Sequence, residues 1–144
     1  MAFLNSMNIV GSALTAERFR TDIILQNLAN INTTMTAEGT PYRRQQVVFQ
    51  ERGINFKDAL DNERYKISGG GVRVAEVVES QTEFTPVYNP NHPHADENGY
   101  VLMPNVNRAE ETVELMAATR AYESNMTALK VVQAMAMKAL EIGK

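Results

Sequence analysis

The sequence predicts an α+β chain in which long N- and C-terminal helices pair as a coiled-coil-like hairpin, with a small β-rich middle segment. Three observations lead to this prediction. Residues 2–31 contain no proline and one glycine, and residues 107–142 contain neither. Residues 32–106 contain all five prolines and six of the eight glycines, together with short β-branched runs. Since proline and glycine interrupt helices, we divide the chain into residues 1–31, 32–106 and 107–144.

The N-terminal segment has apolar residues at helical spacing on two opposite sides. One side is a heptad-like series that includes the polar residues Glu17 and Thr21. Its apolar members, which we predict to lie in a helical assembly interface, are Met7, Val10, Leu14, Ile24 and Leu28. The opposite side carries Ile9, Ser12, Ala16, Phe19 and Ile23. A helix with two apolar sides needs two partners to cover it.

The C-terminal segment has the signals of one long helix over residues 108–142. Asn107 is a suitable N-cap, and Glu110 stands where a capping-box carboxylate belongs. Glu110, Glu111 and Glu114 favour the positive end of the helix dipole, and Gly143 suits the position after the last turn. At 1.5 Å per residue this helix would be roughly 50 Å long, which indicates a coiled coil more than a compact domain.

Two apolar series run along this predicted helix. The first is an imperfect heptad seam whose principal members are Leu115, Tyr122, Met126 and Leu129. The second is displaced by two positions, about 200° around the helix, and includes Ala128, Val131 and Met135. If the two helices cover one face each by pairing, the remaining faces need partners from outside the chain. The alternative is a single-chain helical core that the middle segment closes.

The middle segment contains four candidate strands. They cover residues 45–50, 72–78, 84–88 and 100–103, and residues 55–60 could form a helical turn. Asn98-Gly99 is a turn signal directly before the last strand. The three glycines at 69–71 precede a strand and lack the Lys-Ser or Lys-Thr of a phosphate-binding loop, so we interpret them as a flexible segment.

Composition excludes several classes of function. Fourteen Lys and Arg residues against seventeen Asp and Glu residues leave a net charge of −3. This weak, mixed charge argues against a nucleic-acid or membrane-surface partner. The chain has no cysteine, which excludes disulfides and thiolate chemistry. The N-terminus has no basic region followed by a continuous apolar run, so it does not look like a cleaved secretory signal.

One loop has residues that could bind a metal. His92, His94 and Asp96 carry imidazole and carboxylate groups that suit zinc or another divalent ion. Their spacing matches no established zinc motif, and we favour a solvated turn over a metal site. Arg43 and Arg44 form a small basic patch, which we expect to contribute to inter-subunit ion pairs or to form a solvated edge.

Three stretches resemble the flagellar rod and axial protein family. QNLANINTT at 26–34, followed by Pro-Tyr-Arg-Arg at 41–44, is similar to the Asn-rich signature of these proteins. VYNPNHPHADENGYVLMPNVN at 87–107 resembles the diagnostic segment of a proximal-rod member, and RAYESNMTALKVVQAM resembles its C-terminal helix. The residues that we assign to the family motif are Asn27, Asn30, Pro41, Tyr42, Arg43, Pro90, His92, Pro93, Gly99, Tyr100, Pro104 and Asn105.

The resemblance implies a structural subunit of the flagellar basal-body rod, without catalysis, cofactor, metal or small-molecule substrate. It implies assembly with copies of itself, with other rod proteins and with the basal-body base. It also implies passage through the flagellar type III export apparatus to a rod in the cell envelope, without signal cleavage. Two rival functions are a small metal-binding enzyme that uses His92, His94 and Asp96, and a cytoplasmic coiled-coil adaptor.

Overall fold

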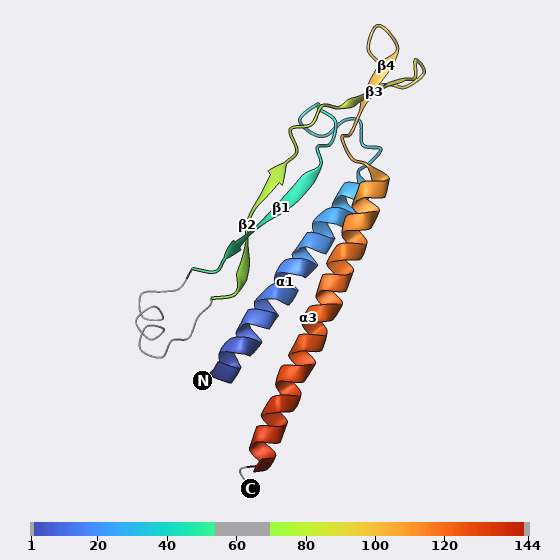
Figure 1. Ribbon diagram of the computed structural model, residues 1–144. Helices are drawn as coiled ribbons and strands as arrows, with labels where there is room; N and C mark the ends of the chain where they lie inside the picture. The colour runs from blue at the N-terminus through green and yellow to red at the C-terminus, as the bar shows by residue number, and fades with distance from the viewer. Residues whose placement is uncertain (1, 54–69, 143–144) are drawn as a thin grey trace. The chain divides into compact units, whose positions relative to one another are not determined.

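The computed structural model describes residues 2–53 and 70–142, and it confirms the α+β class (Figure 1). The elements in chain order are α1 (Ala2–Ala29), β1 (Gln45–Glu51), β2 (Val72–Glu79), β3 (Thr85–Tyr88), β4 (Tyr100–Met103) and α3 (Arg108–Ile142). The helical turn predicted at residues 55–60 lies outside the described residues. No helix among the described residues combines the length and the apolarity needed to span a membrane.

The chain forms two compact units. The first unit consists of residues 1–19, 48–76 and 118–144, and the second of residues 20–47 and 77–117. Strand β1 pairs with β2, and β3 pairs with β4 in a second two-stranded sheet. Both sheets belong to the predicted middle segment, between the two terminal helices.

Helix α3 begins as its sequence predicts. The backbone N–H of Ala109 donates to Oδ1 of Asn107 at 3.0 Å, and the N–H of Glu111 donates to the Asn107 carbonyl at 3.0 Å. Asn107 is therefore the N-cap, and it satisfies one of the donors that a helix start leaves unpaired. The carboxylate of Glu110 forms an ion pair with Arg44, a long-range contact outside the capping-box geometry.

In the first unit, β2 begins against α1. The N–H of Val72 donates to Oγ of Ser12 at 3.0 Å, and this hydroxyl donates to the Ile9 carbonyl at 2.7 Å. Ala16, one turn further along the helix, is buried. The chain thus covers part of the second face of α1 itself. For this stretch, the expectation that the face needs a partner from outside the chain is wrong.

Gly71 allows this close approach. Its φ is +83°, and a Cβ at this position would lie 2.3 Å from Oγ of Ser12. At Gly70, a Cβ would lie 2.1 Å from the carbonyl oxygen of Arg52. These two glycines therefore allow close contacts with Ser12 and with the backbone of Arg52, and the interpretation of residues 69–71 as a flexible entry to a strand stays a prediction.

We expect Gly71→Ala to lower the free energy of unfolding by about 3 kcal/mol, because it adds a steric clash to an unfavourable positive φ. Gly39→Ala is the matched control, since Gly39 also has a positive φ, of 77°, but has open space around it. The control should cost only about 1 kcal/mol. Urea unfolding followed by circular dichroism measures both, and equal losses would contradict the contact with Ser12.

In the second unit, β3 and β4 form an antiparallel hairpin. Its register pairs Val87 with Val101 and Tyr88 with Tyr100. The predicted turn before β4 is confirmed. Gly99 has a φ of +80°, and the N–H groups of Asn98 and Tyr100 donate to Oδ1 of Asp96 at 2.9 and 2.8 Å.

Candidate functional site

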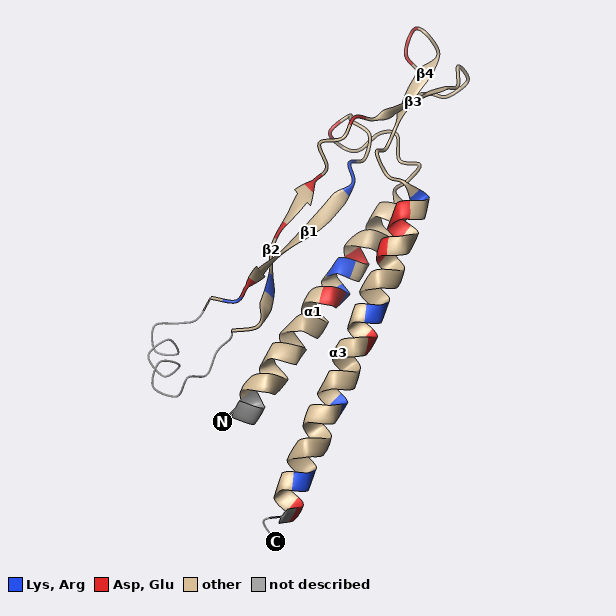
Figure 2. Cartoon of the chain, in the orientation of Figure 1, with Lys and Arg blue, Asp and Glu red and all other residues tan. Residues whose placement is uncertain are grey.

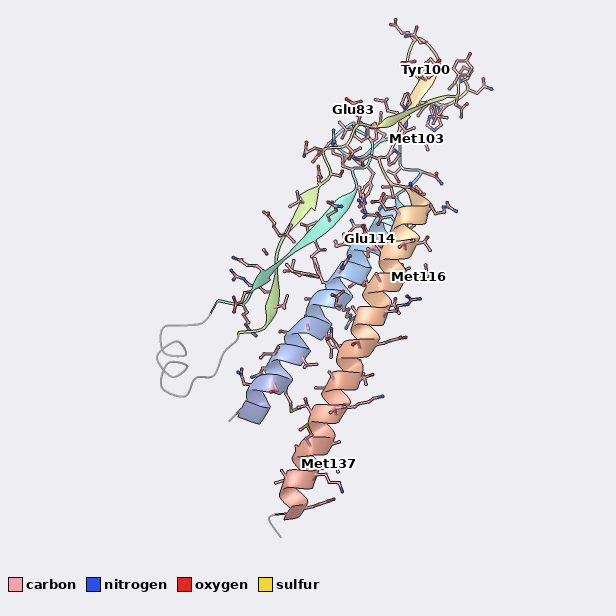
Figure 3. All side chains as sticks on the ribbon, viewed as in Figure 1. Glu83, Tyr100, Met103, Glu114, Met116 and Met137 are labelled. Carbon is pink, nitrogen blue, oxygen red and sulfur yellow. The ribbon has the colours of Figure 1, made fainter. Side chains whose placement is uncertain are left out.

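A partly buried ion-pair network in the second unit joins α1, the start of β1 and the start of α3. Its centre is Arg44, the residue directly before β1. The guanidinium Nε donates to Oε1 of Glu111, and Nη2 donates to Oε1 of Glu114 at 2.7 Å. Nη1 lies 3.2 Å from Oε1 of Glu110. Figure 3 labels Glu114 on the first turns of α3. One cation is thus held by three carboxylates, and a second cation, Arg20, lies 3.9 Å from Glu114.

Asn27 connects this network to α1. Its Nδ2 donates to Oε2 of Glu111 at 3.0 Å and to the carbonyl of Gln45 at 2.8 Å. Its Oδ1 accepts from the hydroxyl of Tyr42 at 2.8 Å and from the N–H of Gln45 at 3.0 Å. Asn27 is 1% exposed and Glu111 is 0% exposed. Every hydrogen-bonding position of the amide is occupied, as burial of such a group requires.

Asn105 connects the network to the segment that leads into α3. Its Oδ1 accepts from the N–H of Arg44 at 2.8 Å, and its Nδ2 donates to the carbonyl of Thr82 at 3.0 Å. The N–H of Ser80 in turn donates to the Arg44 carbonyl at 2.8 Å. Segments that are far apart in the sequence therefore meet around one arginine, and their relative geometry depends on its charge and hydrogen bonds.

The electrostatics favour the charged form of Arg44. Burial by itself lowers the pKa of the guanidinium, but hydrogen bonds and charges from Glu111 and Glu114 outweigh it, so the pKa lies above its ordinary value. The pKa of the Tyr42 hydroxyl is also raised. The main cause is burial, and the negative charges of Glu111 and Glu79 add to it. The phenol therefore stays protonated and donates to Asn27.

We expect the raised pKa of Tyr42 to make stability fall with pH above about 10. An unfolded tyrosine ionises near pH 10, whereas folded Tyr42 keeps its proton until a higher pH, so ionisation favours the unfolded chain in that range. Tyr42→Phe should cost about 1 kcal/mol at neutral pH and make the alkaline loss shallower. Tyr88→Phe is the control, since Tyr88 is exposed. Parallel alkaline losses in Tyr42→Phe and the parent would contradict this assignment.

Sequence reasoning missed the centre of this network. It placed Asn27, Tyr42 and Asn105 in a family motif without a physical role, and it expected Arg43 and Arg44 in inter-subunit ion pairs or at a solvated edge. That expectation is wrong for Arg44, which is buried in contacts with its own chain. Arg43 lies 4.4 Å above the ring of Phe84 and donates to the Ser80 carbonyl at 3.1 Å. The sequence signal that could have identified this network was the cluster of acidic residues on one face of the first turns of α3.

The other residues of the family motif also lie in the second unit. Asn30 donates to the Gln26 carbonyl at 2.9 Å, and its Oδ1 accepts from Thr33. Pro90 packs beside Gly99 at the end of the β3–β4 hairpin, where Tyr100 is exposed. Pro104 is buried, Pro41 is half-buried and Pro93 is exposed.

The polar groups of the histidine loop contact other groups of the same chain. Nδ1 of His92 accepts from the N–H of His94 at 3.1 Å, and Nδ1 of His94 lies 3.0 Å from the hydroxyl of Thr34. Asp96 accepts the two backbone N–H groups of the turn. Within the described part of the chain, no group of three or more His, Cys, Asp or Glu side chains is placed to hold a metal ion.

On α3, the chain covers residues one position before the predicted seam as well as members of the seam itself. Glu111 and Ala118 are buried, and Asn125 and Val132 are half-buried. The predicted seam passed through Met126, which is exposed together with Tyr122. One position is about 100° of rotation, so these two side chains lie beside the buried line. On α1, Ile24 is buried, and the half-buried predicted residues are Met7, Val10, Leu14 and Leu28.

Helix α3 exposes apolar side chains on both sides of this buried line. One side has Ala128, Val131 and Met135, of which Val131 is 53% and Met135 64% exposed. The other side has Tyr122, Met126, Met137 and Leu140, and Leu140 is 74% exposed. Charged residues such as Glu123 and Lys130 lie between the two sides at helical spacing. Leu115 and Leu129 are half-buried.

Comparison with known proteins shows matches over the whole length of the chain. It is 42% identical to the flagellar basal-body rod protein FlgC of Bacillus subtilis and 43% identical to that of Salmonella typhimurium, with both chains covered completely. It is 39% identical to FlgC of Borreliella burgdorferi over 99% of this chain and 98% of the relative. The family model described as flagellar basal body rod FlgEFG protein C-terminal matches residues 97–142.

Proposed function

We propose that this chain, which belongs to the FlgC family of flagellar basal-body rod proteins, is built into the rod through the exposed apolar sides of its C-terminal helix. It is a structural subunit of the rod and not an enzyme, so the rival functions of a metal-dependent enzyme and a cytoplasmic adaptor are wrong. The observation that supports the proposed interface is the exposure of Val131, Met135, Met137 and Leu140, each at least 53%. Exposed apolar residues in such numbers favour a partner.

The partners that fit this helix are other rod proteins and further copies of the same chain. Two apolar sides on one helix can contact different neighbours, and such heterologous contacts extend into open helical arrays instead of closing into a dimer. A tubular shaft is an array of this kind. Packed helices in such a shaft would transmit torque mechanically, without a cofactor or a substrate.

We also propose that the chain reaches the rod through the flagellar type III export apparatus and is assembled in the cell envelope. This route is supported by membership of the FlgC family of rod proteins.

Deletion of the gene tests the proposed function. Electron micrographs of basal bodies from the deletion strain should show the membrane-embedded base without a complete rod, and the cells should not swim. Expression of the parent chain from a plasmid should restore both. Complete rods in the deletion strain would contradict the proposal.

A further inference from the structure

The β3–β4 hairpin has an exposed apolar face that the rod assignment does not explain. Tyr88 pairs with Tyr100 and Pro86 with Leu102, so these four side chains share one face of the hairpin. Tyr88 is 64% exposed, Leu102 48% and Tyr100 46%. Val101, whose side chain points to the other face, is 2% exposed. We call the four residues Pro86, Tyr88, Tyr100 and Leu102 the hairpin face. Figure 3 labels Tyr100 on this hairpin.

Contacts within the hairpin fix the positions of the two tyrosine rings. The rings of Tyr88 and Tyr100 form an edge-to-face pair with centroids 5.3 Å apart. A Cβ on Gly99 would lie 3.0 Å from the Tyr88 ring, so the glycine leaves space for this ring. The N–H of Asn89 donates to the Gly99 carbonyl at 2.8 Å and closes the end of the hairpin. Rigid exposed aromatic side chains lose little entropy on binding and are typical of interaction hot spots.

The loop of the hairpin is acidic. Residues 85–103, from the start of β3 to the end of β4, contain two acidic residues and no Lys or Arg. These two acids, Asp96 and Glu97, lie in the loop between β3 and β4, and both are exposed. Figure 2 shows this loop without any basic residue. A partner surface for the hairpin should therefore be apolar at its centre and basic at its edge.

A groove in the first unit has these properties. It has a volume of about 440 Å³ and lies where β2 meets α1. Its apolar lining includes Ala16, Phe19, Val72 and Val74, and Phe19 is 40% exposed. Arg52 and Arg73 line the same groove. The groove thus combines an apolar lining with positive charge, opposite in sign to the hairpin loop.

We propose that the hairpin face of one subunit docks into the α1–β2 groove of a second copy of this chain. The tyrosine pair and Leu102 pack against Phe19, Val72 and Val74, while Glu97 lies near Arg73. This contact rests on the proposed function as a rod subunit, and it adds a second contact between copies to the helical one. Since the hairpin and the groove are different surfaces, the contact is heterologous and continues from copy to copy.

A contact between two identical hairpin faces is disfavoured by charge. It would bring the acidic loops of both copies together, and like charges across an interface oppose association. The α1–β2 groove instead offers two arginines to this loop, so the observations favour the groove of a second copy over self-pairing of the hairpin.

Disulfide cross-linking tests the contact directly, because the chain has no cysteine of its own. Cells should express two tagged copies, one with Phe19→Cys and one with Leu102→Cys. After oxidation, basal bodies should contain a disulfide-linked dimer that carries both tags, whereas cells with either variant alone should show no dimer. A monomer band alone would overturn the proposal, and so would a dimer formed by Leu102→Cys alone.

Charge reversal provides an independent measurement. Glu97→Arg and Arg73→Glu should each reduce the number of complete rods per cell at least tenfold, and the double variant should restore at least half of the parent number. Single variants that assemble normally, or a double variant no better than either single variant, would overturn the proposal. If the deletion strain lacks rods but these variants behave like the parent, only the proposed docking contact is contradicted, and the proposed function stands. If the deletion strain builds rods, the proposed function fails.

Discussion

Replacing Arg44 by Met is expected to lower the free energy of unfolding by about 3–5 kcal/mol. Glu111 is fully buried, and its charge is balanced mainly by the guanidinium of Arg44. Methionine fills a similar volume but carries no charge, so the carboxylate of Glu111 would be left buried with only the amide of Asn27 as a partner. Urea unfolding of the purified monomer, followed by circular dichroism, measures the loss.

Two further variants separate charge from packing. Arg18→Met removes an exposed arginine from α1 and should change the free energy of unfolding by no more than about 0.5 kcal/mol. Adding Glu111→Gln to Arg44→Met removes the unbalanced charge and keeps an acceptor for Asn27. This double variant should therefore recover about 1–2 kcal/mol of the loss. If the double variant were no more stable than Arg44→Met, a buried unpaired carboxylate would not be the cause.

The second large effect concerns assembly. Ala128→Glu should abolish rod completion and swimming while leaving the monomer folded. Ala128 is exposed on α3 beside Val131 and Met135, so a carboxylate there faces water in the monomer and costs little, about 0.5 kcal/mol or less. In the rod, a neighbouring subunit packed on this side would bury the carboxylate without a partner, which is strongly disfavoured. Swimming assays and electron micrographs of basal bodies measure the effect.

Thr127→Glu is the matched control for Ala128→Glu. It introduces the same charge one residue earlier, about 100° around the helix, toward Glu123 and Lys130. The new carboxylate would have Lys130 three positions later and Glu123 four positions earlier, so its local electrostatic effects nearly cancel. Cells with this control should swim. Normal swimming with Ala128→Glu at the parent's expression level would contradict packing on this side of α3.

Arg44→Met and Ala128→Glu test two different properties of the molecule, which are the stability of the fold and the assembly of the rod. Arg44 and its carboxylates stabilise the fold of the second unit, with every hydrogen-bonding position of Asn27 used within the chain. Ala128, Val131 and Met135 contribute little to the fold of the monomer, because they are exposed. An effect on stability without a specific effect on assembly is therefore expected for Arg44→Met, and the reverse is expected for Ala128→Glu.

The sequence by itself determined the features that depend on neighbouring residues. The distribution of proline and glycine located α1 and α3, Asn107 marked the start of α3, and Asn98-Gly99 marked the turn before β4. Each of these signals acts over a few residues, since helix caps and turns are made by side chains and backbone groups one to four positions apart. The resemblance of 26–34 and 87–107 to flagellar axial proteins also indicated the family that the full-length matches establish.

Only the tertiary structure decided which distant groups meet. Arg44 and Glu111 are 67 positions apart, and nothing in the pattern around either residue specifies the other. On α3, the chain covers Glu111 and half of Asn125 together with Leu115 and Leu129 of the predicted seam, whereas Tyr122 and Met126 of that seam stay exposed. Likewise, Gly71 and Ser12 are in contact only because β2 returns to α1. The periodicity of the sequence indicates which sides of a helix are apolar. The path of the folded chain decides which of these sides are covered by the chain itself and which remain exposed for a neighbouring subunit.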